Sequence, residues 1–228
     1  MARPIVLCWS GGKDSALALD ALLHNAEWEV VSLVTTVTRD FDRISMHGVR
    51  RALLAAQVAA LGLPLAEAEI SPGATNEQYE SEMARVLTSF REQGVRTVAF
   101  GDLFLADIRA YRERQISALG MKCVFPVWGL DTTDLAHRFV RDGFRAITCC
   151  VDPRQLDQSF CGRELDEAFL RDLPAGVDRC GENGEFHTFV YDGPNFSTPI
   201  DIDRGEVVNR DGFWYCDIMQ RTRAAVIS

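Results

Sequence analysis

The sequence predicts an α/β fold, a parallel sheet with helices on both faces, followed by a smaller α+β region. Apolar, β-branched runs alternate with helical patterns through the first two thirds of the chain. A glycine turn joins the first apolar run directly to the first helical pattern. After about Asp152 the helical patterns give way to short apolar runs separated by Gly- and Asn-rich turns, which are typical of short strands.

The first region is expected to contain alternating strands and helices. Its strands are predicted at residues 5–9, 27–37, 64–70, 95–100, 122–125 and 144–151. Its helices are predicted at residues 14–24, 49–61, 75–93, 107–119 and 132–142. Glycines follow four of these helices, as expected of helix C-caps. We expect the strand at 64–70 to lie at a sheet edge, because it begins with a proline.

The second region is expected to begin after residue 151. Residues 1–151 would then form the ligand-binding domain, and residues 152–228 a smaller region that completes the site on the substrate side. A short helix near 163–170 and strands at 186–191, 198–202, 206–208 and 213–218 are predicted there.

The glycine turn after the first strand predicts a phosphate site. It reads Ser10-Gly11-Gly12-Lys13-Asp14-Ser15. Glycines let the backbone approach a ligand closely, and the helix that follows offers unpaired N–H groups and a partial positive charge. The spacing fits neither the Walker A loop nor the dinucleotide fingerprint. The alternative is an ordinary glycine turn in which Ser10 or Asp14 caps the helix.

Composition limits the classes of partner and location. The net charge is −9, which disfavours a nucleic acid as the main partner, because nucleic-acid-binding proteins usually present a basic face. No apolar run reaches the ~18 residues of a membrane span, and the opening run is too short for a secretory signal. We therefore expect a cytoplasmic protein with no membrane partner, whose seven cysteines are free thiols.

Four further motifs accompany the glycine turn. They are Ser45-Met46-His47-Gly48, residues 101–113, Pro126-Val127-Trp128-Gly129 and Gly181-Glu182-Asn183-Gly184-Glu185-Phe186-His187-Thr188. The turn resembles the pyrophosphate loop of the N-type ATP pyrophosphatases. With these motifs, residues 3–220 resemble the diphthine–ammonia ligase family, the adenine-nucleotide α-hydrolase-like branch of the pyrophosphate-loop ATPases. This resemblance implies a Rossmann-like (HUP-type) sheet.

The resemblance also implies a reaction. ATP adenylates a carboxylate, pyrophosphate leaves, and ammonia displaces AMP to form an amide. The cofactors would be ATP and Mg²⁺, and the partners a carboxylate substrate, small or protein-borne, and ammonia. The chain ends soon after the core, and with Lys13 and Lys122 as the two lysines among 24 basic residues its arginine bias suggests a bacterium. Diphthine is not expected in bacteria. The resemblance therefore supports the family's reaction for this chain better than it supports the family's substrate. A homodimer is left open.

The predicted site residues follow the strand ends and the motifs. The nucleotide-binding set is Ser10, Gly11, Gly12, Lys13, Asp14, Ser15, Thr35, His47 and Gly101. The catalytic set is Asp14, Asp102, Glu182 and Glu185, of which Asp14 and Asp102 are also the expected Mg²⁺ ligands, since Mg²⁺ prefers one or two carboxylates plus phosphate oxygens.

Each of these residues also has a purely structural interpretation. Asp14 can stabilise its own helix dipole, and Asp102 can cap a turn. Glu182 and Glu185 can flank a solvated Asn-Gly hairpin, and His47 can simply begin a helix. Two other functions stay open: a nucleotide-binding sensor without turnover, and a pyrophosphate-loop ATPase that modifies tRNA.

Overall fold

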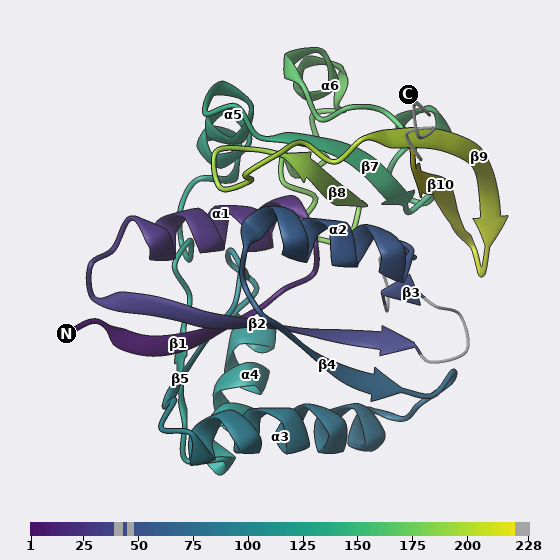
Figure 1. Cartoon of the computed structure of the whole chain (residues 1–228). Helices are drawn as coiled ribbons and strands as arrows, with labels where there is room; N and C mark the ends of the chain where they lie inside the picture. Colours follow the sequence, from purple (N-terminus) through teal and green to yellow (C-terminus); the bar gives the residue numbers. More distant parts are fainter. Residues whose placement is uncertain (39–42, 45–47, 222–228) are drawn as a thin grey trace, which may run out of the picture.

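Two sheets form the molecule, one of six strands and one of four (Figure 1). The computed structural model describes residues 1–38, 43–44 and 48–221. The first sheet contains the parallel strands β1 (Arg3–Cys8), β2 (Trp28–Thr38), β4 (Leu65–Ile70), β5 (Thr97–Ala99) and β6 (Lys122–Val124). They lie in the order β4-β2-β1-β5-β6, and the short β3 (Arg43–Ile44) pairs antiparallel with the end of β2. The predicted α/β fold is confirmed.

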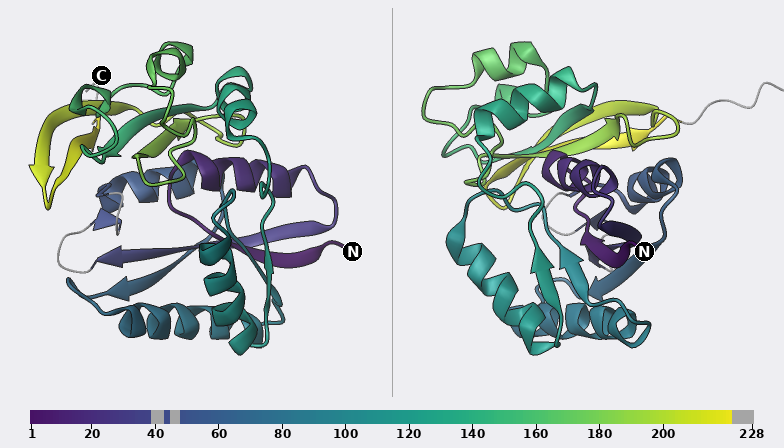
Figure 2. Two further views of the ribbon diagram at one scale, coloured as in Figure 1. Left: turned by 180° about the vertical axis from the view of Figure 1, so that it is seen from behind. Right: turned by 90° about the vertical axis from the view of Figure 1, so that its left-hand side faces the viewer.

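Helices cover both faces of this sheet. The helices α1 (Lys13–Leu23) and α2 (Arg51–Leu61) lie on one face, and α3 (Asn76–Glu92) and α4 (Ala106–Ala118) on the other (Figures 1 and 2). The alternation of β1 explains the arrangement, because successive side chains point to opposite faces. Ile5 and Leu7 belong to the core under α1 and α2, whereas Val6 packs in a second core with Val86 and Leu87 of α3.

The second sheet is antiparallel, in the order β8-β7-β10-β9. Its strands are β7 (Arg145–Val151), β8 (Phe186–Asp192), β9 (Ile202–Arg210) and β10 (Phe213–Gln220). The helices α5 (Thr132–Arg141) and α6 (Glu167–Asp172) cover its outer face, and a 3₁₀ turn, η2 (Gln158–Phe160), lies between β7 and α6. No helix of the described residues is long and apolar enough to cross a membrane.

The expectation that residues 144–151 join the parallel sheet was wrong. This strand, β7, pairs antiparallel with β8 and β10. It is buried from Ala146 to Val151, as a strand covered on both faces must be, so its apolar run looks the same as that of a parallel central strand. The division between residues 151 and 152 stays a prediction. Residues 198–202 are not a strand, because β9 begins only at Ile202.

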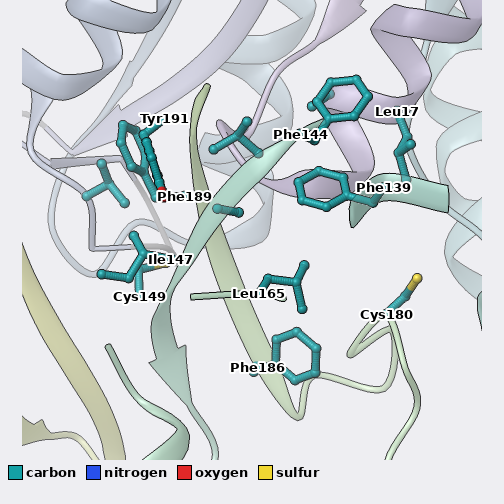
Figure 3. Close-up of a cluster of buried hydrophobic side chains, with 14 of the residues drawn as sticks. Leu17, Phe139, Phe144, Ile147, Cys149, Leu165, Cys180, Phe186, Phe189 and Tyr191 are labelled. Carbon is teal, nitrogen blue, oxygen red and sulfur yellow. The ribbon is translucent and has the colours of Figure 1, made fainter. Parts of the chain in front are cut away.

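The helices α1 and α2 lie between the two sheets and join them into one core (Figures 1 and 2). Figure 3 shows Leu17 of α1 beside Phe139 of α5 and Phe144, and Phe189 and Tyr191 of β8 in another part of the same cluster. The Phe139 and Phe144 rings stack with their centroids 5.0 Å apart. The second sheet is therefore packed directly behind the helix that follows the glycine turn.

Candidate active site

A cavity of about 300 Å³ lies at the carboxyl ends of β1, β2 and β5. The strand β1 lies between β2 and β5. After β1 the chain adds β2 and β4 on one side of it, and then crosses over to add β5 and β6 on the other side, so the strand order reverses at β1. Ligands of open α/β sheets bind at such a reversal. The lining also includes two α3 side chains, one α4 side chain and residues before and within β8. The second sheet therefore closes the site.

The glycine turn has the geometry of an anion site. Gly11 has a φ of +79°, which a residue with a side chain rarely adopts. Gly12 caps α1 without a side-chain hydrogen bond. The N–H groups of Asp14 and Ser15 have no acceptor within the described part of the chain. These free donors at a helix N-terminus suit a phosphate.

The Lys13 ammonium is buried beneath this turn. Its Nζ lies 2.8 Å from both carboxylate oxygens of Asp14, and 5.7 Å from the centroid of the Phe186 ring. Burial is the largest single influence and opposes the charge, but nearby negative groups, the Asp14 carboxylate first among them, together outweigh it and raise the pKa of Lys13. The lysine therefore stays charged at neutral pH. Asp14, by contrast, remains partly exposed and lines the cavity.

Asp102 lies across the cavity at the end of β5. It accepts two hydrogen bonds from Arg112 of α4, at 2.7 Å from Nε and 3.2 Å from Nη2. The Arg112 guanidinium also lies 4.5 Å from the centroid of the Phe100 ring, so the pair is held from two sides. Gly101 lets this strand end touch the first turn of α1, because a Cβ there would lie 2.9 Å from the Asp14 carbonyl carbon and oxygen.

Glu182 connects the turn before β8 to the loop after β5. Its Oε1 accepts from the backbone N–H of Leu103 at 2.8 Å and, more weakly, of Phe104 at 3.4 Å. Burial raises the pKa of Glu182 to about 7; these N–H groups oppose the shift, and the charge of Asp14 adds to it. A cavity-lining carboxyl that titrates near neutral pH can exchange a proton with a reacting group.

Glu185 is used differently. It is buried and does not line the cavity; its oxygens accept from the N–H of Asp178 at 2.9 Å and from the N–H and side-chain amide of Asn183 at 2.9 and 3.1 Å. The Asn183-Gly184 turn closes no hairpin, since loop rather than strand precedes it. These contacts favour a supporting role for Glu185, which would hold the turn that carries Glu182.

The strand β8 supports the glycine turn from behind. The Thr188 hydroxyl oxygen accepts from the N–H of Lys13 at 3.0 Å, and the N–H of Val190 donates to the Gly11 carbonyl at 2.9 Å. His187 lines the cavity, where burial and, to a lesser extent, Lys13 lower its pKa to about 4. Sequence reasoning missed Thr188, although it ends the most distinctive motif.

Comparison with known proteins identifies the family. Residues 2–123 match the diphthamide synthase N-terminal domain, and residues 131–224 match the diphthamide synthase C-terminal domain. The chain belongs to the diphthamide synthase family. The second matched segment begins just before α5, so it contains β7 together with the other strands of the second sheet.

Relatives of this diphthamide synthase family member carry the name diphthine–ammonia ligase. The Schizosaccharomyces pombe protein is 25% identical over 91% of this chain and 37% of its own length. The Bos taurus protein is 33% identical over 46% of this chain and 41% of its own, and the Danio rerio protein 26% identical over 87% and 86%. The chain thus spans about two fifths of the fission yeast relative.

Most of the predicted site residues surround one cavity. Those that line it are Ser10, Gly12, Lys13, Asp14, Ser15, Thr35, Gly101, Asp102 and Glu182. Gly11 and Glu185 lie behind the lining, and His47 lies outside the described residues. Tyr79, Met83 and Arg112 also line the cavity. The first two are four residues apart on α3, which in sequence is an ordinary apolar helix face.

Metal binding by protein groups alone does not fit this site. Within residues 1–38, 43–44 and 48–221, no three His, Cys, Asp or Glu side chains are grouped to hold a metal ion. Asp14 and Asp102 do face the same cavity, each already paired with a cation. Two such carboxylates fit a Mg²⁺ that takes its remaining ligands from phosphate oxygens and water.

Proposed function

We propose that the chain is an ATP-dependent amide ligase. It would adenylate a substrate carboxylate with release of pyrophosphate, and then transfer ammonia to the acyl group with release of AMP. The observation that carries this proposal is the cavity in which the glycine turn, the end of β5 and Glu182 meet. Membership of the diphthamide synthase family and the name of the relatives support it.

The glycine turn is proposed to hold the β- and γ-phosphates. The free N–H groups of Asp14 and Ser15 would donate to phosphate oxygens, and Lys13 would supply a full charge from below. Such preorganised donors stabilise the charge that builds on pyrophosphate as it leaves. Because Lys13 is already neutralised by Asp14, an arriving phosphate would compete with that carboxylate, which is then free to take part in binding Mg²⁺.

Asp102 and Arg112 are proposed to act at the α-phosphate. A Mg²⁺ ion held by Asp14 and Asp102 would neutralise phosphate charge when bound. The Arg112 guanidinium donates one hydrogen bond to each carboxylate oxygen of Asp102, so it fixes the orientation of this carboxylate. The substrate carboxylate oxygen attacks the α-phosphorus, the bond to the bridging oxygen of pyrophosphate breaks, and the acyl-adenylate forms.

Glu182 is proposed to be the proton acceptor for the second step. Ammonium must lose a proton before its nitrogen can attack the acyl carbon, and a carboxylate with a pKa near 7 accepts that proton at neutral pH. Nitrogen then bonds to the acyl carbon and loses one further proton to solvent, while the bond to the AMP oxygen breaks. AMP leaves and the amide remains.

The acid is proposed to be a carboxylate on a small molecule or on a protein side chain. Diphthine, which appears in the name of the relatives, is one candidate. We also propose a cytoplasmic location, where ATP is available and all seven cysteines, which form no disulfide in the structure, would stay reduced. The homodimer stays open.

A product assay tests the proposal. The protein is incubated with ATP, Mg²⁺, ammonium and a panel of carboxylic acids that includes a diphthine peptide, and the nucleotides are separated. The proposal expects AMP and pyrophosphate in equal amounts, dependent on one acid, with a hydroxamate formed when hydroxylamine replaces ammonia. ADP and phosphate, or bound ATP with no turnover, would refute it.

A further inference from the structure

One fully buried amide, on Gln57 of α2, contacts the glycine turn outside the cavity lining. From its contacts we propose that Gln57 is a positioning residue, which holds the turn in its anion-binding conformation and so sets the affinity for the ATP triphosphate. The ATP clause of this proposal rests on the proposed function. The claim that Gln57 fixes the turn does not.

The Gln57 amide makes three hydrogen bonds. Its Oε1 accepts from the Trp9 indole Nε1 at 3.0 Å, and its Nε2 donates to the carbonyls of Gly11 at 2.9 Å and Val190 at 2.6 Å. Both amide protons and one oxygen lone pair are therefore used. A charged or apolar side chain of similar size cannot reproduce this set, because the site needs one acceptor and two donors.

The contact with Gly11 explains how Gln57 would control the anion site. The Gly11 carbonyl accepts from both Gln57 and Val190, so it is held toward the protein interior. The peptide plane is fixed as a consequence, with Gly11 at a φ of +79°. Without the Gln57 donors the plane could rotate and turn the carbonyl oxygen toward the cavity, where its negative end would repel phosphate.

The fit is close on the Gly11 side as well. A Cβ on Gly11 would lie 2.8 Å from the Gln57 Oε1, so the amide occupies the space that the missing side chain leaves. Gly11 is therefore required by the packing of Gln57 as well as by its own backbone conformation. Gly11 and the Gln57 side chain therefore pack against each other and depend on each other for their positions.

The same amide links the two sheets. Val190 lies on β8, an edge strand of the second sheet, and its N–H and C=O bind the Gly11 carbonyl and the Gln57 amide. Helix α2 is tied to this sheet again by Arg50, whose Nε and Nη2 donate to the Asp217 carboxylate of β10 at 3.1 and 2.6 Å. The glycine turn after β1 is thus held in place by β8 directly, through Val190, and by α2, through Gln57.

The first test follows the turn without nucleotide. Gln57→Leu keeps the volume and removes the hydrogen bonds, and Val86→Ala is the control, since it weakens the other core without touching the turn. NMR of the folded proteins should show a shifted Trp9 indole proton and hydrogen exchange at least tenfold faster at the Val190 amide in Gln57→Leu, and neither change in Val86→Ala. Unchanged exchange in a folded Gln57→Leu would overturn the claim that Gln57 holds the turn.

The second test measures ATP affinity by calorimetry. Gln57→Leu should raise the Kd for ATP about tenfold or more, as the loss of two buried hydrogen bonds implies, with kcat at saturating ATP changed less than threefold. Q57E adds a pH readout. The neutral carboxyl of Q57E can donate to one of the two carbonyls, of Gly11 and Val190, whereas the charged carboxylate can only repel them. The ratio of the Q57E Kd to the wild-type Kd should therefore rise with pH.

The outcomes separate the two proposals. If wild type binds ATP but makes no amide, the proposed ligase function is refuted. The comparison of Kd values for ATP between wild type and Gln57→Leu then still decides whether Gln57 affects binding. Wild type that does not bind ATP refutes the ATP clause, and amide exchange then decides whether Gln57 holds the turn. Equal ATP affinities of wild type and a folded Gln57→Leu would refute the role of Gln57 in binding.

Discussion

The Glu182 carboxylate and the backbone N–H of Leu103 are hydrogen-bonded at 2.8 Å, although they lie 79 positions apart. One residue precedes β8 of the second sheet and the other follows β5 of the first. The bond therefore closes the cavity across the boundary between the sheets, and it aims an acid with a pKa of about 7 at the proposed reacting centre.

Glu182→Gln should separate chemistry from binding. The amide oxygen can still accept from Leu103, so the loop stays in place, but the proton acceptor is lost. Amide formation should fall about a hundredfold or more, as typical for loss of a general base, with ATP affinity within threefold. The partly exposed Glu82, which pairs with Arg85, provides the control Glu82→Gln. Equal rates in the two variants would contradict the role of Glu182.

The pH dependence of stability follows from the same carboxyl. Its folded pKa, about 7, is above its ordinary value of 4.5, so the contribution to stability is full below pH 4.5 and is lost as pH rises through 7. Wild type should therefore lose stability relative to Glu182→Gln between pH 4.5 and 7.5, in urea titrations at several pH values. Parallel stability curves for the two proteins would show that burial does not hold the proton on Glu182.

The amidation rate should respond to pH in the opposite direction. Because the deprotonated carboxylate is the active form, kcat should rise as pH increases through about 7. His187 has a pKa near 4 and stays neutral over this range, so it adds no step. A kcat that is flat from pH 6 to 8, with ammonia concentration held constant, would exclude Glu182 as the base.

Lys13→Met should weaken ATP binding. The thioether fills the buried space but leaves Asp14 without its partner and the anion site without its cation. We expect at least a tenfold rise in the Kd for ATP, since a charge-assisted contact contributes about 1.5–3 kcal/mol. The exposed Lys122 gives the matched variant Lys122→Met, which should bind ATP like wild type. Equal affinities of both variants would argue against the site.

Gly101→Ala should disturb the cavity without entering it. Its Cβ would lie 2.9 Å from the Asp14 carbonyl group and 3.0 Å from the Ser15 nitrogen, so the strand end and the first turn of α1 must separate. We expect a loss of about 1–3 kcal/mol in the free energy of unfolding and weaker ATP binding. Gly176→Ala is the control, because no atom lies within 4 Å of its Cβ. If Gly101→Ala behaves like this control, the close approach is not needed.

Thr188→Val should weaken the support behind the glycine turn. Valine keeps the shape of threonine but leaves the Lys13 N–H without its acceptor, 3.0 Å away in wild type. A cost of about 1–3 kcal/mol in unfolding free energy is expected, and Thr188→Ser should recover most of it. Chemical denaturation of the three proteins checks this. Thr188→Ser as unstable as Thr188→Val would show that the methyl group matters, not the hydroxyl.

The local pattern of the sequence was enough to predict the first sheet and the strand-turn-helix that carries the glycine turn. The glycine turn between an apolar strand and a helix predicted the position of Lys13 and Asp14, and Pro64 predicted the edge strand β4, which pairs only with β2 among the described residues. These are properties of neighbours in the chain. They need no knowledge of the tertiary structure.

Long-range contacts were not readable in the same way. The strand β7 is apolar on both faces, so its sequence did not reveal which sheet it joins. Gln57 reads as one polar residue in an Ala-rich helix, and only the packing of α2 against Gly11 and Val190 gives its amide a purpose. Glu182 and Glu185 are alike in sequence, yet one faces the cavity and the other holds the turn.

The most direct test is a crystal structure with Mg²⁺ and an ATP analogue that cannot be cleaved between its α- and β-phosphates. We expect the β- and γ-phosphates on residues 10–15, with the α-phosphate between Asp102 and Glu182. An analogue bound in another hollow of the protein, or density absent from this cavity at saturating concentration, would contradict it.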